Sequence, residues 1–277
     1  MDLFQIIVLS LIQGLTEFLP VSSSAHLILP SKLLGWEDQG VAFDVACHVG
    51  TLLAVIIFYF DRIRKVCAAW LISLRTRVQT ADSRLGWYII FSTVPVCIAG
   101  LLLHHVIEDV FREHAELVIA VTTIVFGILL WFADFYCRRK NNSLTIDTMP
   151  LIVALIVGLS QILAFVPGTS RSGISITFAL FLGLARKDAA DYSFLLSIPL
   201  IMAAGCYSGL KVATSHVAGA ADPVSMMLGI VLSFVSAYLV IKLFIRYISR
   251  IGMTPFVIYR LILGGVLLYV VLSAASS

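Results

Sequence analysis

The chain has 277 residues, of which 60% are hydrophobic and only 13% are charged, and its formal net charge is +3. Soluble globular domains carry about 25% charged residues, so this composition excludes a soluble protein and indicates an integral membrane protein. No basic cluster points to a nucleic-acid partner, and we expect none. The five cysteines are scattered without a C-x-x-C pair, which argues against a disulfide framework or a zinc site.

The first apolar stretch, residues 3–34, is interrupted by the serine-rich loop Pro20-Val21-Ser22-Ser23-Ser24-Ala25-His26. The arm after this loop is too short to cross about 30 Å of hydrocarbon comfortably. We therefore predict a re-entrant hairpin of two helices, with a single span over 3–19 as the alternative. Because no basic region precedes the apolar stretch, we expect no cleaved signal peptide.

Six uninterrupted apolar runs are long enough to span a bilayer. They lie at 41–60, 86–105, 117–136, 191–210, 223–245 and 256–274. Between the third and fourth runs, the stretch 150–184 is interrupted by Pro167-Gly168-Thr169-Ser170-Arg171-Ser172-Gly173 and predicts a second re-entrant hairpin. The predicted fold is an all-α polytopic membrane protein with six transmembrane helices and two re-entrant helical hairpins.

Positive charge gathers in three connections, 61–85, 137–149 and 246–255, which we place on the cytoplasmic side. The connection 104–116 is acidic and histidine-rich and is expected to be an outer loop. With these assignments both termini lie outside and the two hairpins enter from opposite faces. Part of the first basic connection, 67–83, has the pattern of an amphipathic helix that would lie along the membrane interface.

An internal repeat supports this layout. Gly14-Leu15-Thr16-Glu17 is echoed by Gly158-Leu159-Ser160-Gln161, and a Pro-led serine loop follows each. Because three spans separate the hairpins, the two halves would be inverted. We predict a single membrane domain over 1–277, built from inverted repeats at about 1–140 and 150–277. Inverted repeats with broken helices place a ligand near the midplane, at the repeat interface.

The two loops bring Glu17, His26 and Arg171 into apolar surroundings. Ionisable groups are costly in hydrocarbon, so such a cluster indicates a functional site. A helix starting after each loop would offer backbone N–H groups and a positive dipole end, which suit phosphate. Arginine adds a guanidinium that binds phosphate oxygens in a bidentate way. The pattern therefore predicts an anion site, with phosphate favoured because donors outnumber carboxylates.

Hydrolysis would need more than binding. A histidine such as His26 transfers protons near neutral pH, and Ser23 is a nucleophile if a base lies within reach. Glu17 would orient His26, act as that base, or hold a divalent ion such as Mg²⁺. Two alternatives remain open: Glu17 and Arg171 form a purely structural ion pair, or Cys47-His48, with Asp44 four residues earlier, also lines the cavity.

Residues 13–26, Gln13-Gly14-Leu15-Thr16-Glu17-Phe18-Leu19-Pro20-Val21-Ser22-Ser23-Ser24-Ala25-His26, resemble a known signature: [E/Q]-x-x-x-E followed by P-V-S-S-[ST]-[GA]-H. It belongs to the bacterial undecaprenyl-diphosphate phosphatases, the bacitracin-resistance phosphatases. Residues 167–173 match their second signature, P-G-x-S-R-S-G, and the resemblance covers nearly the whole chain.

The resemblance implies hydrolysis of a polyprenyl diphosphate lipid, undecaprenyl diphosphate, to undecaprenyl phosphate and inorganic phosphate. This reaction recycles the lipid carrier for peptidoglycan synthesis and confers bacitracin resistance. The resemblance also implies a divalent cation, Mg²⁺ or Ca²⁺, and a multi-pass protein in the bilayer of the bacterial inner membrane with its site facing the periplasm.

Carried over by position, Glu17, Ser23, His26 and Arg171 would be catalytic, with Glu17 also a metal ligand. Ser23 is the preferred nucleophile over His26. The substrate-binding positions implied are Gln13, Ser22, Ser170, Arg171, Ser172 and Ser175. Gln13 stands where many members have Glu, which weakens a metal site with two carboxylates, although Asp44 is a further candidate.

A transporter or flippase of polyprenyl phosphate or another anion is the alternative function, since inverted repeats with broken helices are also a transporter layout. The discriminating feature is Ser23 beside a proton-transfer group, because transport needs charge and binding but no nucleophile. Small residues such as Ala203-Ala204-Gly205 allow close helix packing, either within the chain or in a homodimer.

Overall fold

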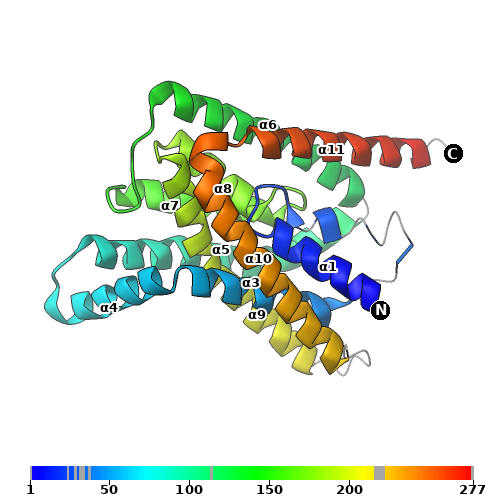
Figure 1. The fold of residues 1–277 in the computed structure, drawn as a ribbon, viewed down its shortest axis with the longest axis horizontal. Coiled ribbons are helices and arrows are strands. Elements are labelled where there is room, and N and C mark those ends of the chain that lie inside the picture. Colours follow the sequence, from blue (N-terminus) through cyan, green and yellow to red (C-terminus); the bar gives the residue numbers. More distant parts are fainter. Residues whose placement is uncertain are drawn as a thin grey trace.

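The computed structural model describes residues 2–23, 25–27, 30, 35–36, 39–112, 115–214 and 222–275. Its helices, in chain order, are α1 (Leu3–Thr16), α3 (Val41–Phe58), α4 (Phe60–Thr76), α5 (Ala81–Arg112), α6 (Ala115–Lys140), α7 (Leu151–Ser160), the 3₁₀ helix η1 (Gln161–Phe165), α8 (Arg171–Phe181), α9 (Arg186–Thr214), α10 (Pro223–Ile251) and α11 (Thr254–Ala275) (Figure 1). Within these ranges β pairing is limited to one isolated bridge, between Leu144 and Leu184.

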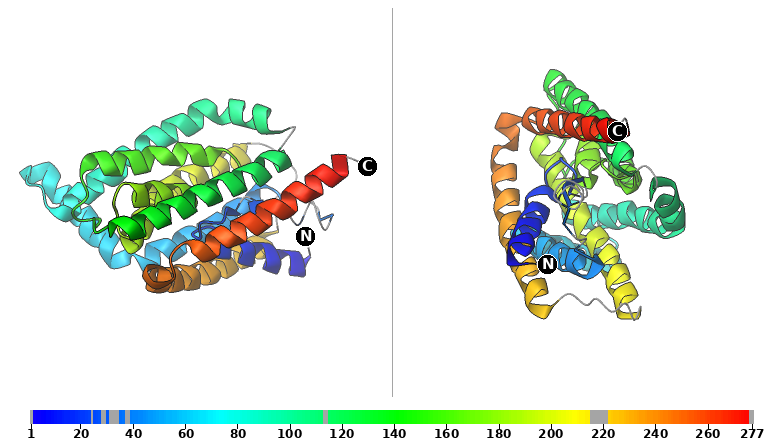
Figure 2. Two further views of the ribbon diagram at one scale, coloured as in Figure 1. Left: turned by 90° about the horizontal axis from the view of Figure 1, so that it is seen from above. Right: turned by 90° about the vertical axis from the view of Figure 1, so that its right-hand side faces the viewer.

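Six of these helices are long and apolar enough to cross a membrane, with mean hydropathies from 1.6 to 2.3. They are α3, α5, α6, α9, α10 and α11, and they coincide with the six predicted spans. The prediction of an all-α polytopic membrane protein with six transmembrane helices is therefore confirmed. Figure 2 shows the long helices running roughly side by side, with shorter elements enclosed among them.

The two interrupted stretches form short helices joined by turns. α7, η1 and α8 cover the second stretch, and α7 packs against α8. A helix of ten residues rises only about 15 Å, half of the hydrocarbon thickness. In the first stretch α1 ends at Thr16 and helical geometry resumes at Ser23, while much of the second arm lies outside the described residues. This fits the predicted hairpins, but their re-entrant course in a bilayer stays a prediction.

α10 holds the first hairpin and α3 together. A Cβ atom added at Gly14 of α1 would lie 1.9 Å from Ser236 Oγ, and one at Gly50 of α3 would lie 2.1 Å from Ser233 Oγ. Both glycines therefore let the helix backbones approach closely, as small residues do between membrane helices. This packing fixes the positions of the turn after α1 and of the start of α3.

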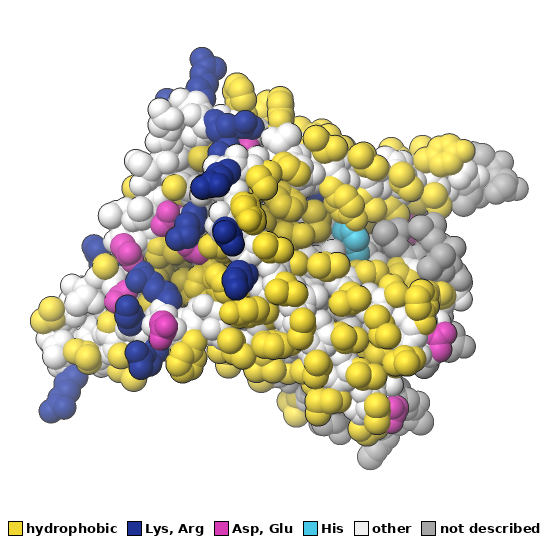
Figure 3. All heavy atoms as spheres, viewed as in Figure 1, with side chains coloured by type: hydrophobic (Ala, Val, Ile, Leu, Met, Phe, Trp, Pro, Cys, Tyr) yellow, Lys and Arg dark blue, Asp and Glu magenta, His cyan; other side chains and the backbone are white. Residues whose placement is uncertain are grey.

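The basic side chains gather at one end of the molecule, opposite the end where the chain termini lie (Figures 1 and 3). Several are paired there: Arg62 contacts Asp82 at 2.8 Å and also Asp147, and Arg186 Nε lies 2.6 Å from Asp134 Oδ1. All the arginines in these pairs come from connections that the sequence places in the cytoplasm or from the start of α9. The distribution fits the predicted sidedness.

One local prediction was wrong, and another is right in part. Residues 104–112 are helical, because α5 continues to Arg112, and are not the expected outer loop. The apolar span ends at Leu103, but the sequence of residues 104–112 contains no glycine or proline that would end the helix. The amphipathic helix expected over 67–83 is α4, Phe60–Thr76, which stops at Arg77 in a left-handed conformation with φ 57°. Its place at the interface stays a prediction.

Candidate active site

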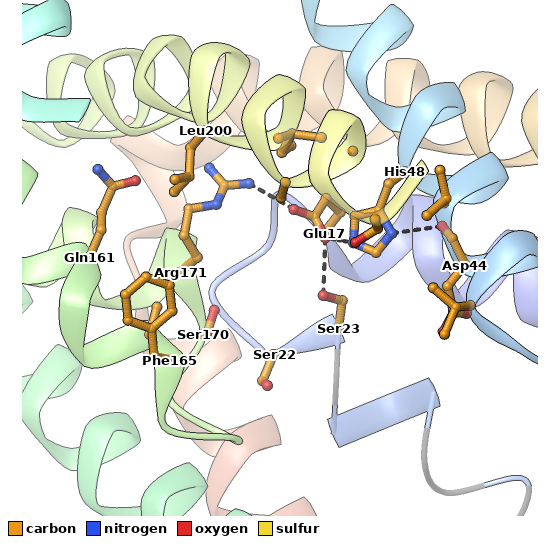
Figure 4. A pocket seen from close by; sticks show the side chains of 17 residues that line it. Glu17, Ser22, Ser23, Asp44, His48, Gln161, Phe165, Ser170, Arg171 and Leu200 are labelled. Carbon is orange, nitrogen blue, oxygen red and sulfur yellow. Dashed lines mark hydrogen bonds and ion pairs between the residues drawn. The ribbon is translucent and has the colours of Figure 1, made fainter. Parts of the chain in front are cut away.

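A cavity of about 520 Å³ lies between the turn after α1, the start of α3, the loop before α8 and the second half of α9 (Figure 4). Its polar lining comprises Glu17, Ser22, Ser23, Asp44, His48, Gln161, Ser170, Arg171 and Ser208. The two serine-rich loops, far apart in sequence, therefore meet at one cavity, as the sequence predicts.

Glu17 is the centre of the polar contacts. Its Oε1 accepts a hydrogen bond from Arg171 Nη2 at 2.8 Å. Its Oε2 accepts from Gln13 Nε2 and from Ser23 Oγ, each at 3.0 Å, and His48 Nε2 lies 3.8 Å from the same oxygen. The residue is only 9% exposed. A buried carboxylate with a cationic partner and several donors is a stable arrangement. It brings together the predicted residues Glu17, Ser23, Gln13 and Arg171.

The two loops share an unusual backbone conformation. Ser22 and Ser170 both have a φ of 73°, in the left-handed region, and helical geometry begins at the next residue in both loops. For a residue other than glycine this conformation costs roughly 1–2 kcal/mol, and such strain persists where the surroundings require it. Ser22 follows the proline of its loop by two residues and Ser170 by three, but each serine directly precedes the helical residues that come after its loop. The match supports the predicted inverted repeat, which remains a prediction.

Arg171 is the first residue of α8, and three contacts fix its side chain. Besides its bond to Glu17, Nη1 donates to the backbone oxygen of Ser193 at 3.4 Å, and the guanidinium carbon lies 5.8 Å from the centre of the Phe18 ring. Ser170 caps the helix, since its Oγ accepts from Gly173 N at 3.1 Å. The guanidinium is thus oriented before any ligand arrives, while its side chain still reaches the cavity.

Two of the predicted substrate-binding serines make contacts within the protein. Ser172 Oγ donates to the backbone oxygen of Leu19 at 2.8 Å, which ties the second loop to the first. Ser175 Oγ donates to the backbone oxygen of Arg171 at 2.9 Å and shares a 2.7 Å hydrogen bond with Ser193 Oγ. Both are buried and neither lines the cavity. Their part in substrate binding stays a prediction, whereas Ser22 and Ser170 do border the cavity.

His26 is not among the residues that line the cavity, although it contacts the backbone of Ser22, which is. Its Nδ1 is 2.7 Å from the backbone oxygen of Ser22, so Nδ1 carries the proton that this bond requires. Nε2 is hydrogen-bonded to the Tyr259 hydroxyl, and the two rings are stacked with centres 5.5 Å apart. Both ring nitrogens are therefore engaged, and a proton-transfer role for His26 stays a prediction.

The alternative that placed Cys47-His48 and Asp44 at the cavity is right for two of its three residues. Asp44 and His48 line it, and His48 Nδ1 donates to the backbone oxygen of Asp44 at 2.8 Å, which turns Nε2 toward Glu17. Cys47 points away, with its Sγ 3.9 Å from Ser10 Oγ among buried side chains.

Sequence reasoning missed Gln161 and Arg260. Gln161 lines the cavity on the far side of Arg171 from Glu17 (Figure 4), is 1% exposed, and its Oε1 has no hydrogen-bond partner. The repeat that aligns it with Glu17 was the available signal. Arg260, like Arg171, is a charged residue within an apolar run, and such a residue by itself indicates a functional role.

Arg260 on α11 is fully buried and holds both loops through backbone oxygens. Its Nη2 donates to the oxygens of Gly168 and Thr169 at 3.0 and 3.1 Å, and Nη1 donates to that of Pro20 at 3.4 Å. Nε donates to Thr123 on α6 at 3.1 Å. The position of one loop relative to the other therefore depends on this arginine.

Within the described residues no three His, Cys, Asp or Glu side chains are grouped as metal ligands. Glu17, however, lies beside Gln13, whose Oε1 is buried without a hydrogen-bond partner. Two hard oxygen donors fit a cation such as Mg²⁺, which takes one or two protein oxygens and completes its shell with water and substrate phosphate. The residues present therefore fit a cation shared with a phosphate ligand.

The family model described as bacitracin resistance protein BacA matches residues 6–266. An undecaprenyl-diphosphatase of Teredinibacter turnerae is 54% identical over 98% of this chain and 99% of its own length. Undecaprenyl-diphosphatase 1 of Pseudoalteromonas translucida is 52% identical over 95% and 97% of the two chains, and an undecaprenyl-diphosphatase of Chromohalobacter salexigens is 53% identical over 97% and 98%.

Proposed function

The chain belongs to the bacitracin resistance protein BacA family, and from that membership we propose that its cavity is the active site of an undecaprenyl-diphosphate phosphatase. The protein is a membrane hydrolase that converts undecaprenyl diphosphate to undecaprenyl phosphate and inorganic phosphate. It recycles the lipid carrier for peptidoglycan synthesis, and this activity underlies bacitracin resistance.

One observation carries the proposed chemistry: the Ser23 hydroxyl and the Arg171 guanidinium contact opposite oxygens of the same carboxylate, Glu17. A hydroxyl held 3.0 Å from a carboxylate has a base within reach. A guanidinium next to it binds and neutralises phosphate oxygens. A nucleophile, a base and an anion-binding group at one cavity match the requirements of phosphoryl transfer.

In the proposed reaction Arg171 and Ser170 bind the diphosphate at the start of α8. Ser23 Oγ attacks the terminal phosphorus and gives its proton to Glu17 Oε2. The bond from that phosphorus to the bridging oxygen breaks, and undecaprenyl phosphate leaves with the bond electrons. Water then attacks the phosphoserine, the bond from phosphorus to the Ser23 oxygen breaks, and that oxygen takes one proton from the water. Glu17 releases the proton that it accepted to water in the open cavity, which restores the carboxylate. Ser23 is preferred over His26 as nucleophile because both nitrogens of His26 already make hydrogen bonds.

A divalent cation, Mg²⁺ or Ca²⁺, belongs to the proposal as a partner of the substrate. When bound it would neutralise charge on the diphosphate oxygens. Glu17 would hold it, helped by the amide oxygen of Gln13, and Asp44 is the other carboxylate at the cavity. Because Glu17 also binds Arg171, the cation and the guanidinium would share the negative charge of the bound diphosphate.

We place the protein in the bacterial inner membrane with its site facing the periplasm. The cavity takes Asp44 from near the start of α3 and Ser208 from the second half of α9. The other ends of these helices adjoin Arg62 and Arg186, in the basic end of the molecule. Since basic connections stay in the cytoplasm, the cavity is nearer the periplasmic ends.

Phosphate release from undecaprenyl diphosphate by detergent-purified protein tests the function. In detergent there is no second compartment, so a transporter produces no phosphate. We expect release with Mg²⁺ or Ca²⁺, its loss on adding EDTA, and its return on restoring the metal. Absence of release from folded protein with either metal would contradict the phosphatase and favour the transporter alternative. Release that EDTA leaves unchanged would contradict the cation.

A further inference from the structure

A second cavity, of about 490 Å³, adjoins the polar one. It lies between α5 and α9 and shares four lining residues with the polar cavity: Phe165, Leu200, Ala204 and Ser208. The two are therefore neighbouring parts of one depression. We call the second part the α5–α9 groove. The walls it does not share include Cys97 and Leu101 of α5 and Ala203 and Tyr207 of α9.

The α5–α9 groove differs from the polar cavity in chemistry. None of its lining residues is charged, whereas the polar cavity has Glu17, Asp44, His48 and Arg171 in its wall. The groove also reaches the outside of the helix bundle, since Leu101 is 64% and Tyr207 43% exposed. Both helices are candidate membrane spans. An apolar path therefore leads from the polar cavity to a surface that faces lipid.

Small residues keep this path open. A Cβ atom added at Gly100 would lie 3.0 Å from Phe165 Cζ, so the absence of a side chain there lets the Phe165 ring rest against α5. On α9, Ala203 and Ala204 line the groove, and Gly205 lines the polar cavity. The patch Ala203-Ala204-Gly205, considered above as a helix-packing surface, thus borders open volume.

We propose that the α5–α9 groove binds the isoprenoid units next to the diphosphate of the substrate. This proposal rests on the proposed function and adds the place of the lipid chain. A diphosphate held by Arg171 and Ser170 has its lipid attached by a single ester oxygen. The chain must therefore leave the polar cavity over an adjoining wall, and Phe165 and Leu200 form such a wall. The remainder of the undecaprenyl chain stays in the bilayer.

Filling the groove tests the proposal through chain length. Ala203→Phe puts a large ring in the groove at a residue that does not line the polar cavity. Cys206→Phe is the matched control, because it places the same ring on an exposed small residue of α9 outside both linings. Substrates are dimethylallyl, farnesyl and undecaprenyl diphosphate, and the readout is kcat and KM for phosphate release.

Ala203→Phe should raise KM for farnesyl and undecaprenyl diphosphate by about tenfold or more, the worth of a few buried CH₂ groups. KM for dimethylallyl diphosphate should change by less than about twofold, because its single isoprenoid unit would reach only the shared wall of Phe165 and Leu200 and not Ala203. Cys206→Phe should behave as wild type with all three substrates. An equal loss with all three substrates, or an unchanged preference for long chains, would overturn the proposal.

A binding measurement separates failure of the groove from failure of the phosphatase. Cys97 lines the groove, whereas Cys206 is exposed elsewhere on α9. In proteins that keep one of these cysteines alone, undecaprenyl phosphate should slow alkylation of Cys97 by N-ethylmaleimide several-fold, and alkylation of Cys206 should not change. Inorganic phosphate and phosphatidylglycerol at the same concentration should not protect Cys97.

This alkylation measurement needs no turnover, so it can be interpreted even if the protein hydrolyses no substrate. Equal protection of Cys97 by phosphatidylglycerol would show that the groove binds ordinary bilayer lipid. No protection by undecaprenyl phosphate would show that the groove does not bind the polyprenyl chain. Either result would overturn the polyprenyl assignment. Protection without phosphate release would keep the groove and contradict the enzyme.

Discussion

The two serine-rich loops share a backbone conformation but carry different functional groups. Both place a serine at a φ of 73° directly before helical geometry begins. The first loop presents the hydroxyl of Ser23 beside the carboxylate of Glu17, which precedes the loop, and the second loop presents the guanidinium of Arg171. The backbone geometry is therefore repeated in the two halves, while the side chains that react lie in the first half and the side chain that binds the anion lies in the second.

The division extends to the residues that precede each loop. Where the first half has Glu17, the second has Gln161. The two side chains also differ in their hydrogen bonds. Both oxygens of Glu17 accept hydrogen bonds, whereas Gln161 Oε1 has no partner. A carboxylate in place of Gln161, on the Arg171 side of the cavity, would repel an anionic ligand at the guanidinium. A neutral amide in the second half leaves the arginine to dominate the charge there.

Removing the hydroxyl of the first loop should have the largest effect. Ser23→Ala deletes the proposed nucleophile and leaves the Glu17–Arg171 pair intact, so kcat should fall by about 10³-fold or more while the substrate still binds. Ser197→Ala, which removes a fully buried hydroxyl that bonds to the backbone of Phe194 and does not line the cavity, is the control and should keep its rate. Substantial turnover by Ser23→Ala would move the nucleophile elsewhere.

Arg171→Lys should have the next largest effect on phosphate release. Lysine keeps the charge but loses the planar fork that joins Glu17, Ser193 and the substrate. Loss of one charge-assisted hydrogen bond, about 1.5–3 kcal/mol, corresponds to a 10- to 100-fold rise in KM. Titrating phosphate release against substrate concentration checks this. A fall in kcat with unchanged KM would instead give Arg171 a role only in the transition state.

Separating the loops should reduce stability. Arg260→Met keeps an apolar side chain of similar length but removes the donor to the backbone oxygen of Thr169 and one of the two donors to that of Gly168, which keeps its bond from Thr123 Oγ1. Each buried acceptor left unpaired costs about 1–3 kcal/mol, so thermal unfolding in detergent should occur at a clearly lower temperature, and activity should fall with it. Arg250→Met, an exposed arginine of α10, serves as control. Unchanged stability in Arg260→Met would show that the loops do not depend on α11.

The smallest effect should come from Gln161 in the second half. Gln161→Ala removes one polar contact to the bound diphosphate, worth about 0.5–1.5 kcal/mol, and should raise KM roughly three- to tenfold with kcat nearly unchanged. Gln161→Glu should be worse than Gln161→Ala, because a second carboxylate opposes the anion. The reverse order would show that a negative charge is tolerated beside Arg171, which the comparison of the loops does not allow.

Hydropathy was sufficient to predict the six spans, because a helix of about twenty apolar residues matches the thickness of the hydrocarbon core and is stable there. The signature residues were found because charges and prolines stand out in apolar sequence. The cavity-lining role of Gln161 escaped because an uncharged amide in a short helix has no such contrast. The orientation of His26 depends on Tyr259, which is 233 residues away, so local sequence carries no trace of it. Hydropathy also failed to predict where α5 ends, because residues 104–112 are more polar than the span and still helical.

The central claim is that the carboxylate of the first loop and the guanidinium of the second act as one unit. A double-mutant cycle with Glu17→Gln, Arg171→Gln and the double variant, measured by metal-dependent phosphate release from undecaprenyl diphosphate, tests it most directly. Residues that act as a unit are strongly non-additive, so the double variant should be about as slow as the slower single variant. A double variant slower by the product of the two single losses would contradict a joint site.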